Sequence, residues 1–495
     1  MSSPTLFLAT SLSLLDPFAL VRVEQPDHPD ALSTSATASV LDHIPPAGTP
    51  WKIEPVPELH RFDETEAVTV TNADLWHADG ARGQGVKLAI FDIGWYAPNG
   101  DLAEVVAEGS HDCWISPSCD LPIDPNRPRL KSEDGNHGMA CAEVVRDVAP
   151  EVDLHLVRVS SLTAFENAVA WAIREDVDVI SMSMSFYNHT FYDGGSSTFD
   201  DLMYKLEAAN VLMVTSAGND ARSHWKGPLI DADGDGLLDF YGENHLQVYG
   251  SGSATVYVNW NQHGRCGDTD LDAELNDGAG EVYARSKQPQ VADADQCQPI
   301  ERVVAGLPEN GILNLEVSLE GGVRAGVEVD VLVRGGDVLR PIAAGSLTDP
   351  AAHPLAFAVG AVRADGYLGN DSEGFSSHGP NNGGHPKPDI AGPDGVSSVA
   401  FGGQGFYGTS ASAPAVAGLI AVVMSDEPGL TPRQASQRLQ GWALGDGLGW
   451  EHPRLGAGRA RLPVREPQTL ACGHRALVAW LLLPPLGWIR RRRRR

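Results

Sequence analysis

Short, almost continuous apolar runs alternate with stretches of helical spacing in the first half of the chain. This pattern predicts helices over residues 139–148 and 164–174, between strands over residues 85–92, 152–159, 177–185 and 211–219. Near-continuous apolar strands between helices indicate a parallel sheet that is covered on both faces. Ligands of such sheets bind beyond the carboxyl ends of the strands, and Asp92 and Asn219 both lie at such ends.

The pattern changes after Asn219, where apolar and polar residues begin to alternate with period two. Stretches 253–260, 311–319 and 326–333 alternate in this way and are separated by glycine-rich turns. This alternation predicts half-buried antiparallel strands, and we expect a small, sandwich-like all-β domain over residues 225–340. The apolar strand 355–362 then restores the first pattern. The fold class is therefore α/β, with a main α/β domain over 71–222 and 345–465 that is interrupted by the β-domain.

Both ends of the chain resemble processing signals. Residues 1–22 carry an apolar run like that of a signal peptide, and residues 23–70 are expected to form a linker or short prosegment. Residues 470–495 combine Cys472, an apolar stretch and a final run of arginines. They resemble the sorting tails of bacterial surface proteins, which predicts a secreted or surface location and transient membrane contact. The alternative is a basic tail with no such role.

Composition narrows the function. The 495 residues carry a formal net charge of −29, so a nucleic-acid partner is not expected, because its phosphates would be repelled. In an oxidising compartment, Cys113 with Cys119 and Cys266 with Cys297 are candidates for disulfides. Cys141 is expected to be a small buried residue.

Ser410 lies in the stretch GFYGTSASAPAVAG, just before an apolar run over 415–423 that predicts a buried helix. A serine at this position is either a helix N-cap or a nucleophile at the positive end of the helix. A nucleophilic serine needs a base and an acid that orients it, and the candidates are His137 and Asp92. The side-chain amide of Asn219 could donate a hydrogen bond to a developing oxyanion. Each of these residues also has an ordinary structural explanation when taken alone.

Together the motifs AIFDIG, NHGMACAEVV, SMSMS, TSAGN and GTSASAP, in this order, resemble the subtilisin-like serine proteases, or subtilases. The resemblance covers about residues 70–220 and 345–465. It implies that Ser410 is the nucleophile, His137 the general base, Asp92 its orienting acid and Asn219 the oxyanion donor. It further implies that an extended polypeptide substrate binds along an edge strand, with these substrate-binding residues: Ser183, Met184, Ser185 and Gly218.

Some positions depart from the family pattern. Met139 and Ala140 stand where the family usually has threonine and histidine after the catalytic histidine and its glycine. Ile93 replaces the usual serine or threonine, and Ser185 stands where glycine is frequent. These changes bear on efficiency and on the substrate pocket rather than on the mechanism. No full-length inhibitory prodomain is evident before Asp92.

The insert contains a second motif, DADGDGLLD, with alternate carboxylates around a glycine. Such carboxylates suit a structural calcium ion, whereas catalysis needs no cofactor. The predicted metal ligands are Asp231, Asp233, Asp235 and Asp239. The twelfth position of an EF-hand would be Gly242 rather than glutamate, so the motif is not a full EF-hand. The alternative is a solvated acidic loop.

The sequence therefore predicts an extracytoplasmic serine endopeptidase that hydrolyses peptide bonds through an acyl-enzyme. Two other functions are compatible with the same motifs. One is a catalytically silent scaffold that binds or adheres to partners through the β-domain, and the other is a peptide ligase that uses the same acyl-enzyme. Oligomeric state is not predicted.

Overall fold

The computed structural model describes residues 20–22, 65–95, 109–123, 132–187, 189–194, 197–263, 269–289, 299–308, 311–320, 325–369, 371–445 and 452–465. The predicted sorting tail, Cys266, Cys297 and Cys472 lie outside these residues. So do most of the predicted signal peptide and most of the predicted prosegment. Cys113 and Cys119 form the predicted disulfide.

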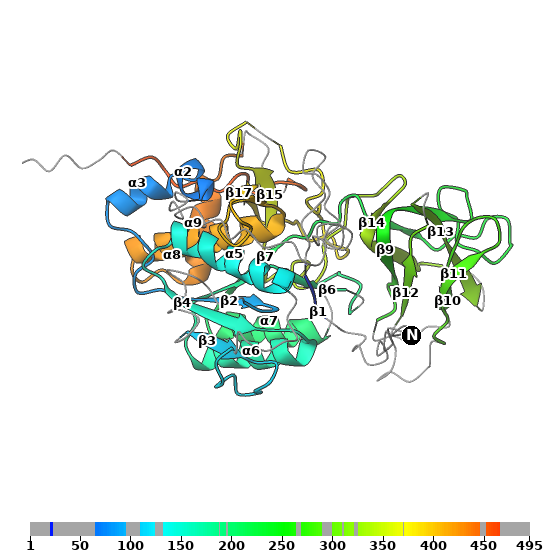
Figure 1. The fold of residues 1–495 in the computed structure, drawn as a ribbon, viewed down its shortest axis with the longest axis horizontal. Helices are drawn as coiled ribbons and strands as arrows, with labels where there is room; N and C mark the ends of the chain where they lie inside the picture. The colour runs from blue at the N-terminus through cyan, green and yellow to red at the C-terminus, as the bar shows by residue number, and fades with distance from the viewer. Residues whose placement is uncertain are drawn as a thin grey trace, which may run out of the picture.

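A seven-stranded parallel sheet lies between the helices of the α/β part of the molecule (Figure 1). Its strand order is β16-β15-β7-β5-β2-β4-β3. Its strands are β2 (Lys87–Asp92), β3 (Ser110–Asp112), β4 (Asp153–Arg158), β5 (Val179–Met182), β7 (Leu212–Ser216), β15 (Phe357–Arg363) and β16 (Ile390–Asp394). The neighbours β7 and β15 lie on opposite sides of the insert in the sequence. The predicted parallel sheet is confirmed.

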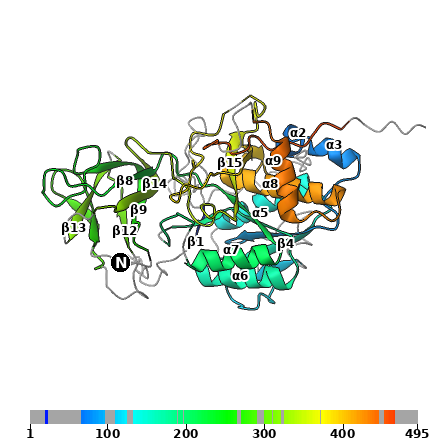
Figure 2. The same cartoon turned by 180° about the vertical axis from the view of Figure 1, so that it is seen from behind.

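Helices cover both faces of this sheet. Helices α5 (Ser132–Val148) and α8 (Thr409–Asp426) pack on one face, together with α2 (Glu66–Val70), α3 (Ala73–Ala78) and α9 (Pro432–Trp442). Helices α6 (Leu162–Arg174) and α7 (Ser197–Ala208) pack on the other face, as Figure 2 shows. Alternate residues of β2 divide between the two apolar clusters, with Leu88 and Ile90 in one and Ala89 and Phe91 in the other. The predicted covering of the parallel sheet on both faces is therefore present, and the fold has three layers.

Helix α8 runs through the centre of the first apolar cluster. It is long and apolar enough to cross a membrane by composition, but 83% of this segment is buried inside the protein. It therefore has the surroundings of a core helix.

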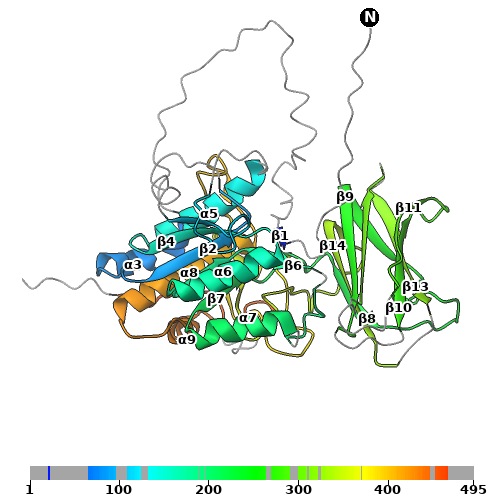
Figure 3. The ribbon, with the colours of Figure 1, turned by 90° about the horizontal axis from the view of Figure 1, so that it is seen from below.

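The insert forms an all-β unit with its own apolar core. Its strands are β8 (His224–Pro228), β9 (Leu246–Trp260), β10 (Asp270–Asn276), β11 (Val282–Ser286), β12 (Ile300–Gly306), β13 (Ile312–Glu320) and β14 (Glu328–Val338). All seven are hydrogen-bonded into one antiparallel sheet, because the long β9 pairs with β12, β13 and β14 at once. Figure 3 shows β9 and β14 on the side toward the α/β layers, with β10, β11 and β13 on the far side.

Two short pairings complete the described structure. Strand β17 (Val396–Ser397) pairs with β18 (Gly405–Phe406) just before α8. Strand β1 (Leu20–Arg22) pairs antiparallel with β6 (Met184–Phe186). The predicted strand over residues 177–185 is thus two strands, since the chain breaks at Ser183 between β5 and β6.

Candidate active site

Asp92 and His137 form a buried hydrogen-bonded pair beyond the end of the parallel sheet. Asp92 is the last residue of β2, and its Oδ2 lies 2.7 Å from Nδ1 of His137 on α5. Both side chains are completely buried. The second carboxylate oxygen, Oδ1, accepts the backbone N–H of Ile93 at 2.7 Å. Because the carboxylate holds Nδ1, Nε2 is the nitrogen of His137 that can accept a proton from a nucleophile.

A glycine next to His137 allows α5 to approach the loop that follows β2. A Cβ atom at Gly138 would lie 2.4 Å from the carbonyl oxygen of Gly94 and 3.0 Å from the Trp95 ring. Any larger residue would therefore force α5 and this loop apart. On its other side the His137 ring meets the edge of Phe406, with 5.6 Å between ring centroids.

Ser410 is the second residue of α8, and Gly408 is the N-cap residue. The N-cap explanation of Ser410 is therefore wrong, because the helix begins earlier than the apolar run at 415–423 indicates. Gly408 has a φ of 103°, a conformation that favours glycine. Its backbone N–H donates to Oδ1 of Asp394, whose carboxyl pKa is raised well above the usual value by burial and by nearby Glu373.

Two side chains hold the backbone of Ser410 beside the Asp92–His137 pair. Ser183 donates its hydroxyl to the carbonyl oxygen of Ser410 at 3.1 Å. The thiol of Cys141 lies 3.7 Å from the same carbonyl oxygen and 3.9 Å from Oδ2 of Asp92. Cys141 is buried as predicted, but its position between acid and serine has no signal in the sequence beyond its place one turn after His137.

Asn219 lies in the loop after β7 and is oriented by Thr409. Its Oδ1 accepts both the backbone N–H and the hydroxyl of Thr409, each at 3.0 Å. This fixes the direction of the amide, because the oxygen end is occupied and Nδ2 points the other way. Nδ2 would lie 3.0 Å from a Cβ at Gly408, the residue that begins the serine turn. Nδ2 of Asn219 thus lies close to the N-cap residue of α8, at the positive end of this helix.

The predicted substrate-binding residues lie along and beside β6. Met184 and Ser185 belong to this strand, and Ser183 immediately precedes it. The backbone of Leu20–Arg22 already pairs with this strand antiparallel, with Val21 opposite Ser185. Strand β6 therefore accepts an extended chain.

Gly218, the fourth predicted substrate-binding residue, lies in the loop after β7 rather than along β6. Its N–H donates to the Thr409 hydroxyl at 3.2 Å, and its carbonyl oxygen accepts the N–H of Ser377 at 2.9 Å. Both backbone groups are thus used to hold the loop that carries Asn219.

Three of the four predicted metal ligands converge. Asp231, Asp233 and Asp235 each offer one oxygen, and these oxygens lie within 4.8 Å of one another. Backbone N–H groups of the loop hold the carboxylates, as with Gly234 donating to Oδ1 of Asp231 at 2.7 Å. Asp239 is not in this group, and its Oδ2 accepts the N–H of Ala232 at 2.7 Å.

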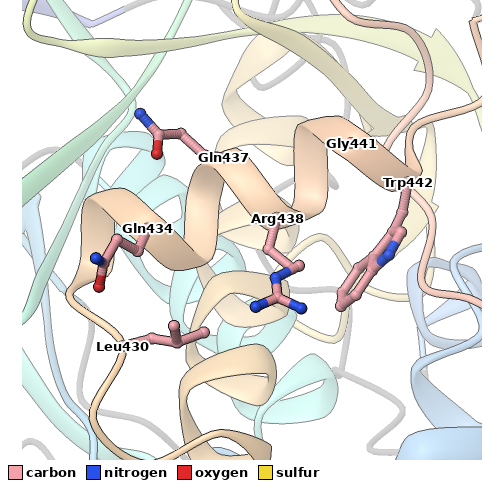
Figure 4. Close-up of a pocket in the computed structure, with 6 residues that line it drawn as sticks. All are labelled: Leu430, Gln434, Gln437, Arg438, Gly441 and Trp442. Atoms are coloured by element: carbon pink, nitrogen blue, oxygen red, sulfur yellow. The ribbon is translucent and has the colours of Figure 1, made fainter.

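A groove of a different kind lies on the surface of α9 (Figure 4). Its lining is formed by Leu430, Gln434, Gln437, Arg438, Gly441 and Trp442. None of these six residues belongs to the candidate catalytic group, so the groove is separate from the site.

A buried carboxylate–imidazole pair beside a serine at a helix start, at the carboxyl edge of a parallel sheet, is the arrangement of a serine peptidase. The family model of the subtilase family matches residues 83–258 and 336–458. The chain belongs to the subtilase family.

Two proteins that this chain is similar to are named as a protease and a subtilisin. The chain is 24% identical to the thermostable alkaline protease of Halalkalibacterium halodurans over 196 residues, which are 34% of this chain and 48% of the relative. It is 27% identical to subtilisin DY of Bacillus licheniformis over 172 residues, which are 32% of this chain and 55% of the relative. The chain thus spans about half the length of these two relatives.

A solved structure shows the same fold over most of the chain. The CspB protease of Clostridium perfringens superposes with a TM-score of 0.55 and 17% sequence identity, covering 80% of this chain and 97% of that one.

Proposed function

We propose that this chain is a serine endopeptidase that hydrolyses peptide bonds through an acyl-enzyme on Ser410. The observation that carries the proposal is the 2.7 Å bond between His137 and Asp92, both fully buried, with α8 beginning beside them. A structural scaffold has no need of a desolvated carboxylate–imidazole pair next to a helix start that carries a serine.

In the proposed reaction the hydroxyl oxygen of Ser410 attacks the carbonyl carbon of the scissile bond while its proton passes to Nε2 of His137. Asp92 stabilises the imidazolium through Nδ1, and the Asn219 amide donates to the carbonyl oxygen as it becomes negative. His137 then gives the proton to the leaving amine, and the acyl-enzyme remains. Water attacks the acyl carbon, its proton returns through His137 to Ser410, and the carboxylic acid is released.

The substrate is proposed to be an extended polypeptide that adds a strand to β6. The pairing of Leu20–Arg22 with Met184–Phe186 supports this, because it shows an extended chain in this position. The same pairing would exclude a substrate from the strand. We therefore propose that Leu20–Arg22 competes with substrate until it leaves β6.

We propose that the protein acts outside the cytoplasm and contains structural calcium. The Cys113–Cys119 disulfide supports an oxidising compartment. The converging oxygens of Asp231, Asp233 and Asp235 fit a hard cation, which would stabilise the loop rather than take part in the reaction.

A fluorophosphonate probe tests the catalytic proposal, because it labels a serine that is activated by a base. We expect labelling at Ser410 in the full chain and in a form freed of Leu20–Arg22. Labelling should disappear in both Ser410→Ala and His137→Ala. If the folded protein takes up no probe in either form, the alternative of a catalytically silent binding scaffold replaces the peptidase. If the probe labels but peptides are joined rather than hydrolysed, the ligase replaces it.

A further inference from the structure

The inserted β-domain packs directly against the two segments that adjoin β6 and the Asn219 loop of the candidate active site. Tyr257 and Leu332 of the insert share an apolar cluster with Tyr187 and Ala217. Tyr187 immediately follows β6, and Ala217 precedes the Gly218–Asn219 loop. The rings of Tyr187 and Tyr257 stack with their centroids 5.2 Å apart and their planes at 16°. This is the side of the insert formed by β9 and β14, which faces the α/β layers in Figure 1.

A buried polar network crosses the same boundary. The Tyr187 hydroxyl donates to the carboxylate of Asp220, 3.1 Å from Oδ2 and 3.3 Å from Oδ1. Arg334 of β14 lies over the Tyr187 ring, with 5.4 Å from Cζ to the centroid. Burial raises the pKa of the Asp220 carboxyl, and the positive charge of Arg334 opposes this shift. Charge on the insert therefore acts on the residue that directly follows Asn219.

Strand β14 also holds the chain that follows Asp220. The backbone N–H of Val333 donates to the carbonyl oxygen of Ser223 at 2.9 Å. One residue further, Nε2 of His224 lies 3.1 Å from Oδ2 of Asp330, and both side chains are buried. Asp330 also accepts a hydrogen bond at 3.0 Å from Asn382, which lies in the part of the α/β domain that follows the insert. The end of the Asn219 loop at Ser223 is thus held by the backbone of β14, and Asp330 of the same strand joins His224 of β8 to Asn382.

We propose that the inserted domain helps to position the active site. In this proposal Arg334 of the insert holds Tyr187 and Asp220 in place, and these two residues fix the orientation of the Asn219 amide. This inference rests on the proposed function, because it concerns the oxyanion donor of that mechanism. Apolar packing alone would hold the two faces together, and buried charged groups carry a desolvation penalty. What the network adds is direction, since the Tyr187 hydroxyl and the Ser377 Oγ, 3.1 Å from the Asp220 nitrogen, orient the loop.

The test is Tyr187→Phe, which removes the hydroxyl and keeps the ring stacked on Tyr257. We expect kcat on a chromogenic peptide amide to fall about ten- to a hundredfold, with KM changing less than kcat, because small displacements of a catalytic group have effects of this size. Tyr241→Phe is the matched control. Its hydroxyl donates to the carbonyl oxygen of Arg340 at 2.7 Å within the insert, and we expect its kcat to equal that of the wild type.

A double mutant separates positioning from general stability. If Tyr187 acts through Asn219, then Tyr187→Phe should change kcat by less than about threefold once Asn219 is already alanine. Equal losses in both backgrounds would overturn the inference, as would a lower Tm with unchanged kcat. Arg334→Met, which keeps an apolar stem but no charge, should show the same dependence and replaces Tyr187→Phe if that variant does not fold. If Asn219→Ala alone leaves kcat unchanged, the oxyanion role in the proposed function fails instead.

Discussion

Thr409→Val tests how the structure orients the candidate oxyanion donor. The change keeps the shape of the side chain but removes the hydroxyl that donates to Oδ1 of Asn219 at 3.0 Å and accepts the N–H of Gly218 at 3.2 Å. The backbone N–H of Thr409 still holds Asn219 at 3.0 Å. One of two orienting hydrogen bonds is therefore lost.

The magnitude follows from this count. One net hydrogen bond is worth about 0.5–1.5 kcal/mol, so the ratio of oriented to misoriented amide should fall about two- to tenfold, and kcat should fall by up to that factor. The loss has an upper limit of about 10²- to 10³-fold, which is the usual effect of removing one oxyanion donor altogether. The buried N–H of Gly218 also loses its acceptor, which should lower the free energy of unfolding by about 1–3 kcal/mol.

Steady-state kinetics on a peptide amide and a thermal melt measure the two effects separately. Thr409→Ser keeps the hydroxyl and serves as the control, with kcat within about twofold of the wild type since both hydrogen bonds remain. The reasoning is refuted if Thr409→Val has the kcat of the wild type. It is also refuted if the change lowers kcat by the same factor when Asn219 is already alanine.

Three further predictions concern calcium, the first strand and pH. Excess EGTA should lower the Tm of the wild type, whereas the Tm of Asp231→Asn should be the same with and without EGTA. A wild-type Tm that does not change in EGTA would remove the calcium proposal. A chain that begins at Val23 should have a lower KM for peptide substrates and an unchanged kcat, because β1 no longer occupies β6; an unchanged KM would contradict the competition. Burial raises the pKa of Asp349 to about 7, so between roughly pH 4 and 7 the folded state holds a proton that the unfolded state has lost. Stability should therefore fall as pH rises through this window, and Asp349→Asn should flatten the fall in melts recorded at several pH values.

The parallel sheet and the order of the candidate residues could be predicted because both are written in local patterns. Apolar runs identify β2, β4, β5 and β7. Asp92 ends β2 as the pattern predicts, whereas β7 ends at Ser216 and Asn219 lies in the loop beyond it. The start of α8 could not be placed in this way. Small residues such as Ala411 and Ala413 carry little hydrophobic signal, and Pro414 lies inside the helix, so the sequence pattern places Ser410 before the helix, although it is the second residue of α8.

The burial of the second face of the insert could not be predicted from the sequence either. Alternation correctly places Val256 and Val258 of β9 in the core of the β-domain. By the same alternation Tyr257 and Asn259 should face solvent, yet both are buried, because this face contacts the α/β layers. Period-two patterns report one side of a strand, whereas a contact between domains depends on which surfaces meet. The orienting role of Thr409 is hidden for the same reason, since it depends on two loops that are distant in the sequence.

The two ends of the insert lie side by side, and this has a consequence for the order of folding. Strands β7 and β15 are neighbours in the parallel sheet, with Phe357 opposite Val214, although roughly 140 residues separate them in the chain. The insert shortens this separation once it has formed, because the N–H of Val338 donates to the carbonyl oxygen of Arg222 at 3.1 Å and brings its two ends together. The effective loop is then about 30 residues, which reduces the entropic cost of pairing β7 with β15 by about 1.4 kcal/mol. An insert that folds early would therefore bring β7 and β15 close together, and the parallel sheet would be completed after the insert had folded.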